Sequence, residues 1–170
     1  MRKLSLKLGA GAPGLLLTAM LLAACTPEAP PQEQDPAPVF RHEGTLTVFD
    51  AGAPVVTVDI EIADTDSLRN RGLMGRESLP DLSGMLFVFD QASIQNFYMA
   101  NTPLSLDFLF IGPDSVVVNT VKYAQPLSLG NISSTGPAQW VLEMPAGFVD
   151  TYGLMAGNRV AWSRTDGAGS

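Results

Sequence analysis

Residues 55–62 read Val-Val-Thr-Val-Asp-Ile-Glu-Ile, and their pattern decides the fold class. Apolar and polar side chains alternate along this stretch. The apolar face carries Val56, Val58, Ile60 and Ile62, and the polar face carries Thr57, Asp59 and Glu61. Because successive side chains of a strand point to opposite faces, the alternation predicts a half-buried β-strand.

Other short apolar segments lie on both sides of this stretch. They are residues 45–49, 85–89, 94–99, 106–111, 115–121, 139–144 and 159–163. Residues 85–89 (MLFVF) are apolar throughout, which is typical of a strand buried on both faces. Gly112-Pro113-Asp114 predicts a hairpin between two of the segments, whereas residues 126–137 predict a long loop.

Helices are few in this pattern. Asp64 or Thr65 can cap a helix after the strand at 55–62, and Leu68 and Leu73 are spaced to face the core. Residues 148–152 predict a short helical turn. Seven or eight short strands with one or two short helices predict a mainly β domain, which we expect to be a compact antiparallel barrel or sandwich.

The domain predicted from this pattern spans residues 44–164, and the chain before it has a different composition. Residues 1–24 contain a basic head, an apolar run and small residues, in the order of a secretory signal peptide. Residues 25–43 contain five prolines and predict an extended tether. Residues 165–170 predict a frayed tail.

The run Leu22-Ala23-Ala24-Cys25 resembles the lipobox of bacterial lipoproteins, in which the signal is cut before the cysteine and lipid is attached to its sulfur. An uncleaved transmembrane anchor is the alternative, but the apolar run is interrupted by glycine and proline and is shorter than the roughly 20 residues of a span. We therefore expect an exported protein, anchored through lipid on Cys25 to the cell membrane or outer membrane. Its domain would face the periplasm or the cell exterior.

The charge of the chain argues against nucleic acid as a partner. The chain has 17 acidic and 10 basic residues, a net charge of −7, and cleavage before Cys25 would leave seven basic residues against the same 17. A single cysteine and a single histidine, His42 at the edge of the tether, argue against disulfides, thiol catalysis, a Ser-His-Asp triad and zinc sites. We expect no cofactor and no metal. A divalent cation held by carboxylate ligands alone is the alternative.

Three groups of motifs resemble a known family, the bacterial and archaeal domain of unknown function 192. They are residues 71–80 (RGLMGRESLP) with 84–89, residues 97–102 (FYMANT) with 106–111, and residues 141–147 (VLEMPAG) with 157–160. The resemblance covers roughly residues 55–163 and implies a compact, mainly β domain, often exported, with no established biochemical function. Ala100 stands where this family often has lysine, so a ligand held by that lysine would bind more weakly here.

The charged and polar members of these motifs are the candidate site residues. Asp107 lies in an apolar run, and a buried carboxylate needs a partner. One interpretation is a structural ion pair with Arg71 or Arg76, because a guanidinium matches a carboxylate in shape. The other is a pocket for a small polar or anionic ligand. The pocket residues would be Arg71, Arg76, Asn101, Thr102 and Asp107.

The leading functional hypothesis is therefore a non-enzymatic ligand-binding or accessory module of the cell envelope. A carboxylate-dependent hydrolase of envelope polymers is an alternative, with Asp107 and Glu143 as its two carboxylates. A protein-interaction module, whose partner the sequence does not identify, is another. Under the ligand-binding hypothesis, Asp107→Asn would abolish the effect of the ligand and leave the fold largely intact.

Overall fold

The structure is a computed structural model that describes residues 39–165. The predicted signal peptide, Cys25, most of the tether and residues 166–170 lie outside this range. The strands are β1 (Gly44–Asp50), β2 (Ala53–Ala63), β3 (Ser83–Ser93), β4 (Asn96–Phe97), β5 (Leu106–Ile111), β6 (Val117–Ala124), β7 (Ile132–Ser133), β8 (Ala138–Pro145) and β9 (Arg159–Arg164). The helices are α1 (Asp66–Arg71) and α2 (Phe148–Thr151).

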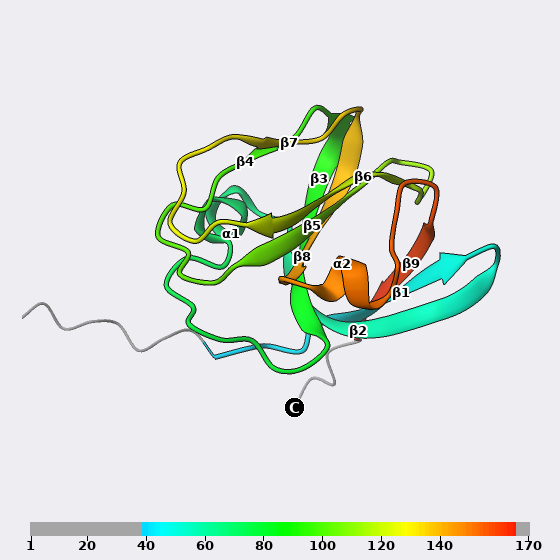
Figure 1. The fold of residues 1–170 in the computed structure, drawn as a ribbon, viewed down its shortest axis with the longest axis horizontal. Helices are drawn as coiled ribbons and strands as arrows, with labels where there is room; N and C mark the ends of the chain where they lie inside the picture. Colours follow the sequence, from blue (N-terminus) through cyan, green and yellow to red (C-terminus); the bar gives the residue numbers. More distant parts are fainter. Residues whose placement is uncertain (1–38, 166–170) are drawn as a thin grey trace, which may run out of the picture. The chain divides into compact units, whose positions relative to one another are not determined.

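Seven of the strands form one curled sheet in the order β6-β5-β8-β3-β2-β1-β9 (Figure 1). Its two edge strands approach each other at one end, through a single bridge between Val116 and Arg159, so the sheet does not close into a full barrel. The prediction of a mainly β fold with short helices is confirmed. Within residues 39–165 there are nine strands. The two-residue strand β4 lies where the sequence predicted a longer strand, and its partner β7 lies in the predicted loop at 126–137.

One neighbouring pair in the sheet is parallel, whereas the sequence predicted an antiparallel arrangement. Strands β2 and β3 run in the same direction, with Ile60 opposite Gly84. Parallel neighbours require a crossover, and here α1 and the loop after it provide one. The helix begins where Thr65 Oγ1 accepts a hydrogen bond from the backbone N–H of Leu68, as the capping pattern predicted.

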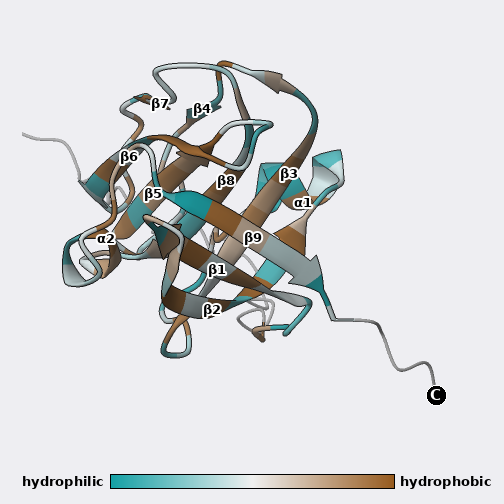
Figure 2. Cartoon of the chain, turned by 90° about the vertical axis from the view of Figure 1, so that its right-hand side faces the viewer, coloured by the Kyte–Doolittle hydropathy of each residue, from teal (hydrophilic) through white to brown (hydrophobic). Residues whose placement is uncertain are grey.

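The sheet separates two apolar cores, and its central strands are brown with apolar residues in Figure 2. The inner core lies inside the curl, where all the long strands and α2 contribute side chains such as Ile60, Leu142 and Phe148. The outer core lies on the other face of β3, β8 and β5, with Phe87, Phe108 and Val141 in it. Segments around α1, β4 and β7 cover the outer core, which explains why β5 is buried along its whole length.

Candidate functional site

A cavity of about 170 Å³ opens beside the outer core, between the crossover segment and the loop that contains β4. Its lining divides evenly between aromatic or aliphatic side chains and polar or charged side chains. The wall residues used below are Arg69, Arg71, Leu73, Met74, Phe87, Phe89, Gln95, Phe97, Tyr98, Met99, Thr102 and Glu143. Small-molecule sites usually combine apolar walls with a small number of polar groups, and this cavity has side chains of both kinds.

Glu143 is the buried carboxyl group of this cavity. It lies on β8 between Met85 of β3 and Phe108 of β5, and 6% of the residue is exposed. Burial raises the pKa of the Glu143 carboxyl to about 8, because the apolar surroundings disfavour the charged form. At neutral pH this side chain is therefore mainly a neutral acid, able both to donate and to accept a hydrogen bond.

Two arginines of α1 border the same cavity, and they differ in their contacts. Arg69 donates hydrogen bonds to the backbone oxygens of Asp64 and Val88, both at 2.7 Å, and pairs with Asp66. Arg71 is exposed and forms no hydrogen bond or ion pair with any side chain of residues 39–165. Both lie in the last turn of α1, where a positive charge suits the helix dipole.

Asp107 lies on the opposite face of the sheet, away from this cavity. Its Oδ1 accepts a hydrogen bond from the backbone N–H of Tyr123 at 2.8 Å. Its Oδ2 accepts from the N–H groups of Gly147 at 3.0 Å and Val149 at 2.9 Å, at the start of α2. Neither Arg71 nor Arg76 contacts it in the described part of the chain, so backbone N–H groups supply the partner that the sequence assigned to arginine.

The loop around α2 is tied to β6 by a second carboxylate. Asp150 accepts hydrogen bonds from Lys122 Nζ and from the hydroxyl of Tyr123, both at 2.7 Å. The Lys122 hydrogen bond, followed by that of Tyr123, lowers the pKa of the Asp150 carboxyl. Asp107 and Asp150 together therefore position α2 against β6, which is a structural task.

The two carboxylates of the hydrolase hypothesis do not face one site. Asp107 is opposite Met144 on β8, and Glu143 is the next residue along that strand. Because adjacent strand residues point to opposite faces, the seven-stranded sheet lies between the two carboxyl groups. They cannot flank one glycosidic bond. Within residues 39–165, no three Asp, Glu, His or Cys side chains gather closely enough to hold a metal ion.

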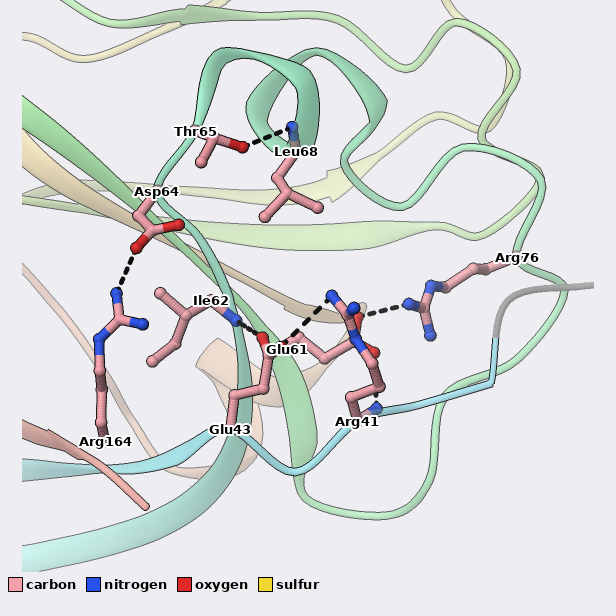
Figure 3. A network of polar contacts seen from close by, with 9 residues as sticks. All are labelled: Arg41, Glu43, Glu61, Ile62, Asp64, Thr65, Leu68, Arg76 and Arg164. Atoms are coloured by element: carbon pink, nitrogen blue, oxygen red, sulfur yellow. Dashed lines mark hydrogen bonds and ion pairs between the residues drawn. The ribbon is translucent and has the colours of Figure 1, made fainter. Parts of the chain in front are cut away.

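Arg76 forms a buried ion pair with Glu61, which the alternation along β2 placed on the polar face (Figure 3). The side chain of Arg76 is 6% exposed and that of Glu61 is 1% exposed. Glu61 Oε1 also accepts the backbone N–H of Arg41 at 2.6 Å. Arg76 Nε is buried without an acceptor in the described region. Arg76 does not line the Glu143 cavity; it borders an adjoining hollow, shared with Arg71.

The remaining two predicted residues divide between the cavity and the surface. Thr102 lines the cavity, is 5% exposed, and donates a hydrogen bond to the backbone oxygen of Ala100 at 3.2 Å. Asn101 is exposed in a left-handed turn (φ 54°), and its backbone oxygen accepts from Gly75 N–H at 2.8 Å. The cavity thus brings together Arg71 and Thr102 with Glu143, which the sequence placed in a strand but did not place in the ligand site.

Comparison with known proteins gives a family and two similar structures. The model of DUF192, described as "Uncharacterized ACR", matches residues 47–162. A crystal structure from Sinorhizobium meliloti 1021, provisionally assigned as a transcription regulator, is 32% identical with a TM-score of 0.69, and the match covers 74% of this chain and 97% of that one. A protein of unknown function from Novosphingobium aromaticivorans DSM 12444 is 31% identical with a TM-score of 0.66, over 69% of this chain and 84% of that one. No curated protein matches the chain.

Proposed function

The chain belongs to the DUF192 family, as its motifs predicted, and we propose that this member is a non-enzymatic module that binds a small ligand at the cell envelope. The cavity around Glu143 is the observation that carries the proposal. A carboxyl group with a pKa near 8 lies in a partly apolar cavity of about 170 Å³, and carboxyl groups with strongly shifted pKa values in clefts are typical of functional sites. Structural roles account for the other buried charges, Asp107 and the Arg76–Glu61 pair.

Thermal unfolding of the full-length protein against a panel of anions, sugars, nucleotides and metals tests this proposal. A ligand at 100 times its dissociation constant stabilises the folded state by about 2.7 kcal/mol, which moves the midpoint by several degrees. Met74→Trp fills the cavity and should abolish the shift. Met155→Trp is the matched control, because Met155 is 61% exposed and does not line the cavity. A panel without any shift, or a shift that survives Met74→Trp, contradicts the proposal.

The lipid anchor on Cys25 is the second part of the proposal, and it rests on the Leu22–Cys25 motif, outside the described residues. Within residues 39–165, no helix is both long and apolar enough to cross a membrane. Labelling with radioactive palmitate in a bacterial host should mark the protein and place it in the membrane fraction. Cys25→Ser should lose both the label and the membrane association, whereas Thr26→Ser should keep them. An unlabelled wild-type protein would refute the anchor.

A protein-interaction module is the second candidate, and exposed apolar side chains favour it. Tyr98, Leu127 and Leu129 are 56%, 61% and 79% exposed, on two loops joined by the backbone hydrogen bond from Met99 to Ser128. Isolated exposed apolar residues are common, but neighbouring ones often mark an interaction site. Crosslinking in intact envelopes should then trap a partner that is lost in Leu129→Ser and retained in Met155→Ser.

A further inference from the structure

We propose that the ligand is a small organic anion with a ring-sized apolar body, an acidic group at Arg71 and a hydrogen-bonding oxygen at Glu143. This inference rests on the proposed function, because it names the class of ligand for the same cavity. Three observations carry it: the size and lining of the cavity, the distribution of charge around its wall, and a carboxyl group without a partner inside it.

The size and lining of the cavity define the body of the ligand. A cavity of about 150 Å³ can hold a molecule the size of benzene, and this cavity, with about 170 Å³, is of similar size. Phe87 and Phe97 meet edge to face, with ring centroids 5.0 Å apart, and Leu73 and Met99 are almost fully buried beside them. An apolar ring would replace water against these side chains and be stabilised by the hydrophobic effect.

The charges around the wall favour an anion. Among the described residues, the charged side chains at the cavity besides Glu143 are Arg69 and Arg71, both from α1. Of the acids beside the cavity, Glu61 lies beyond Met85 and is paired with Arg76, and Asp66 is paired with Arg69. The contacts of Arg69 occupy its guanidinium. Arg71 therefore remains available for the acidic group of a ligand, and a guanidinium binds carboxylates well.

Aromatic walls can also hold cations, but the charges here oppose that arrangement. The guanidinium carbon of Arg69 already lies 5.5 Å from the centre of the Phe89 ring. A second cation would be repelled by Arg71, and the neutral Glu143 would supply no compensating charge at neutral pH. Tyr98 is the remaining titratable side chain that lines the cavity.

Glu143 defines the polar end inside the cavity. The Glu143 carboxyl forms no hydrogen bond with any group of residues 39–165, and the residue lines the cavity, so a bound molecule can reach it. A polar group that faces a cavity and has no partner in the protein favours a ligand that supplies one. A hydroxyl or carbonyl oxygen on the apolar body would do so, because a neutral carboxyl can donate and accept. Ionisation of Glu143 above pH 8 would instead repel an anionic ligand.

Four probes that share a ring separate these contributions: 4-hydroxybenzoate, benzoate, 4-hydroxybenzamide and tyramine. Their dissociation constants are measured by calorimetry on the full-length protein at pH 6.5. We expect 4-hydroxybenzoate to bind most tightly, because it has both the acidic group and the hydroxyl. Benzoate should bind about 2–10-fold more weakly than 4-hydroxybenzoate, because it lacks one neutral hydrogen bond. 4-Hydroxybenzamide should bind about 10–100-fold more weakly, because it lacks the charged hydrogen bond to Arg71. Tyramine should bind weakest.

Variants then locate the two ends of the ligand. Arg71→Gln should make 4-hydroxybenzoate bind no better than 4-hydroxybenzamide. Arg159 is an exposed arginine on β9, and Arg159→Gln should leave the dissociation constants of both compounds unchanged. In the wild type, affinity for 4-hydroxybenzoate should fall about tenfold per pH unit above pH 8, as the neutral acid is lost. Glu143→Gln should remove this fall, because its amide does not ionise.

The outcomes distinguish this inference from the proposed function. If tyramine binds more tightly than 4-hydroxybenzoate and Glu143→Gln abolishes its binding, the cavity is a cation site and the anion inference is overturned. If all four probes fail but another compound gives a shift that Met74→Trp removes, the cavity binds a different class and the inference is again overturned. If no compound binds, both proposals fail together.

Discussion

Glu143→Gln should stabilise this protein at neutral and alkaline pH, although it removes a buried functional group. Glutamine has nearly the shape of the protonated acid and cannot ionise. The wild-type carboxyl has its ordinary pKa of 4.5 in the unfolded chain and about 8 in the folded protein. Between these values the folded state holds a proton that the unfolded state has released. The free energy of unfolding therefore decreases as the pH rises from 4.5 to 8.

The size of the effect follows from the two pKa values. One pKa unit corresponds to 1.36 kcal/mol, so the rise from 4.5 to about 8 is equivalent to about 5 kcal/mol at pH 8 and above. At pH 7 the same relation gives about 3 kcal/mol. The cavity of about 170 Å³ next to the carboxyl is large enough to admit water, which reduces the penalty for ionisation, and we expect a measured difference of about 2–5 kcal/mol at pH 8.

Urea unfolding of the wild type and of Glu143→Gln between pH 4 and pH 9 measures this difference. The two proteins should be equally stable near pH 4, where both side chains are neutral, and should diverge as the pH rises, with a plateau above pH 8. Their difference cancels the titration of other groups, which the two proteins share. Curves that stay parallel across the whole range would refute the reasoning, because Glu143 would then ionise equally in the folded and unfolded states.

Three further substitutions test the structural charges and one close contact. Asp107→Asn removes the carboxylate that accepts three backbone N–H groups, and it should lower the free energy of unfolding by about 3 kcal/mol. Asp90→Asn is the control at an exposed position and should change the free energy of unfolding by less than about 0.5 kcal/mol. If both variants lose the same stability in urea unfolding, Asp107 does not hold α2 in place as described. Arg76→Met leaves Glu61 buried and unpaired and should lower the free energy of unfolding by about 3–5 kcal/mol, while the double variant with Glu61→Leu should recover most of the loss. If the double variant is no more stable than the single one in urea unfolding, the pair is not the cause. Gly84→Ala adds a methyl group that overlaps the backbone of β8, and it should lower the thermal midpoint by several degrees, equivalent to about 1–3 kcal/mol. An unchanged midpoint would show that β3 and β8 can move apart to accept the methyl group.

Much of the secondary structure was predictable because its causes are local. The apolar run at 106–111 coincides with β5, and Gly112-Pro113-Asp114 forms the turn to β6, where Asp114 Oδ1 accepts the N–H of Val116 at 3.2 Å. Thr65 caps α1 as predicted. The two-residue strands β4 and β7 were not predictable as a ladder, because each exists only by pairing with the other across more than 30 residues.

The sequence by itself determined the long strands, the cap, the family and the small number of groups that could perform chemistry. Only the tertiary structure decided which face each charge occupies. Alternation placed Glu61 on a polar face, but the crossover after α1 covers that face and provides Arg76 as its partner. In strands with apolar residues on both faces, such as β5 and β8, the sequence pattern does not distinguish one face from the other. The pairing of strands therefore placed Asp107 against the backbone of α2 and left Glu143 in the cavity.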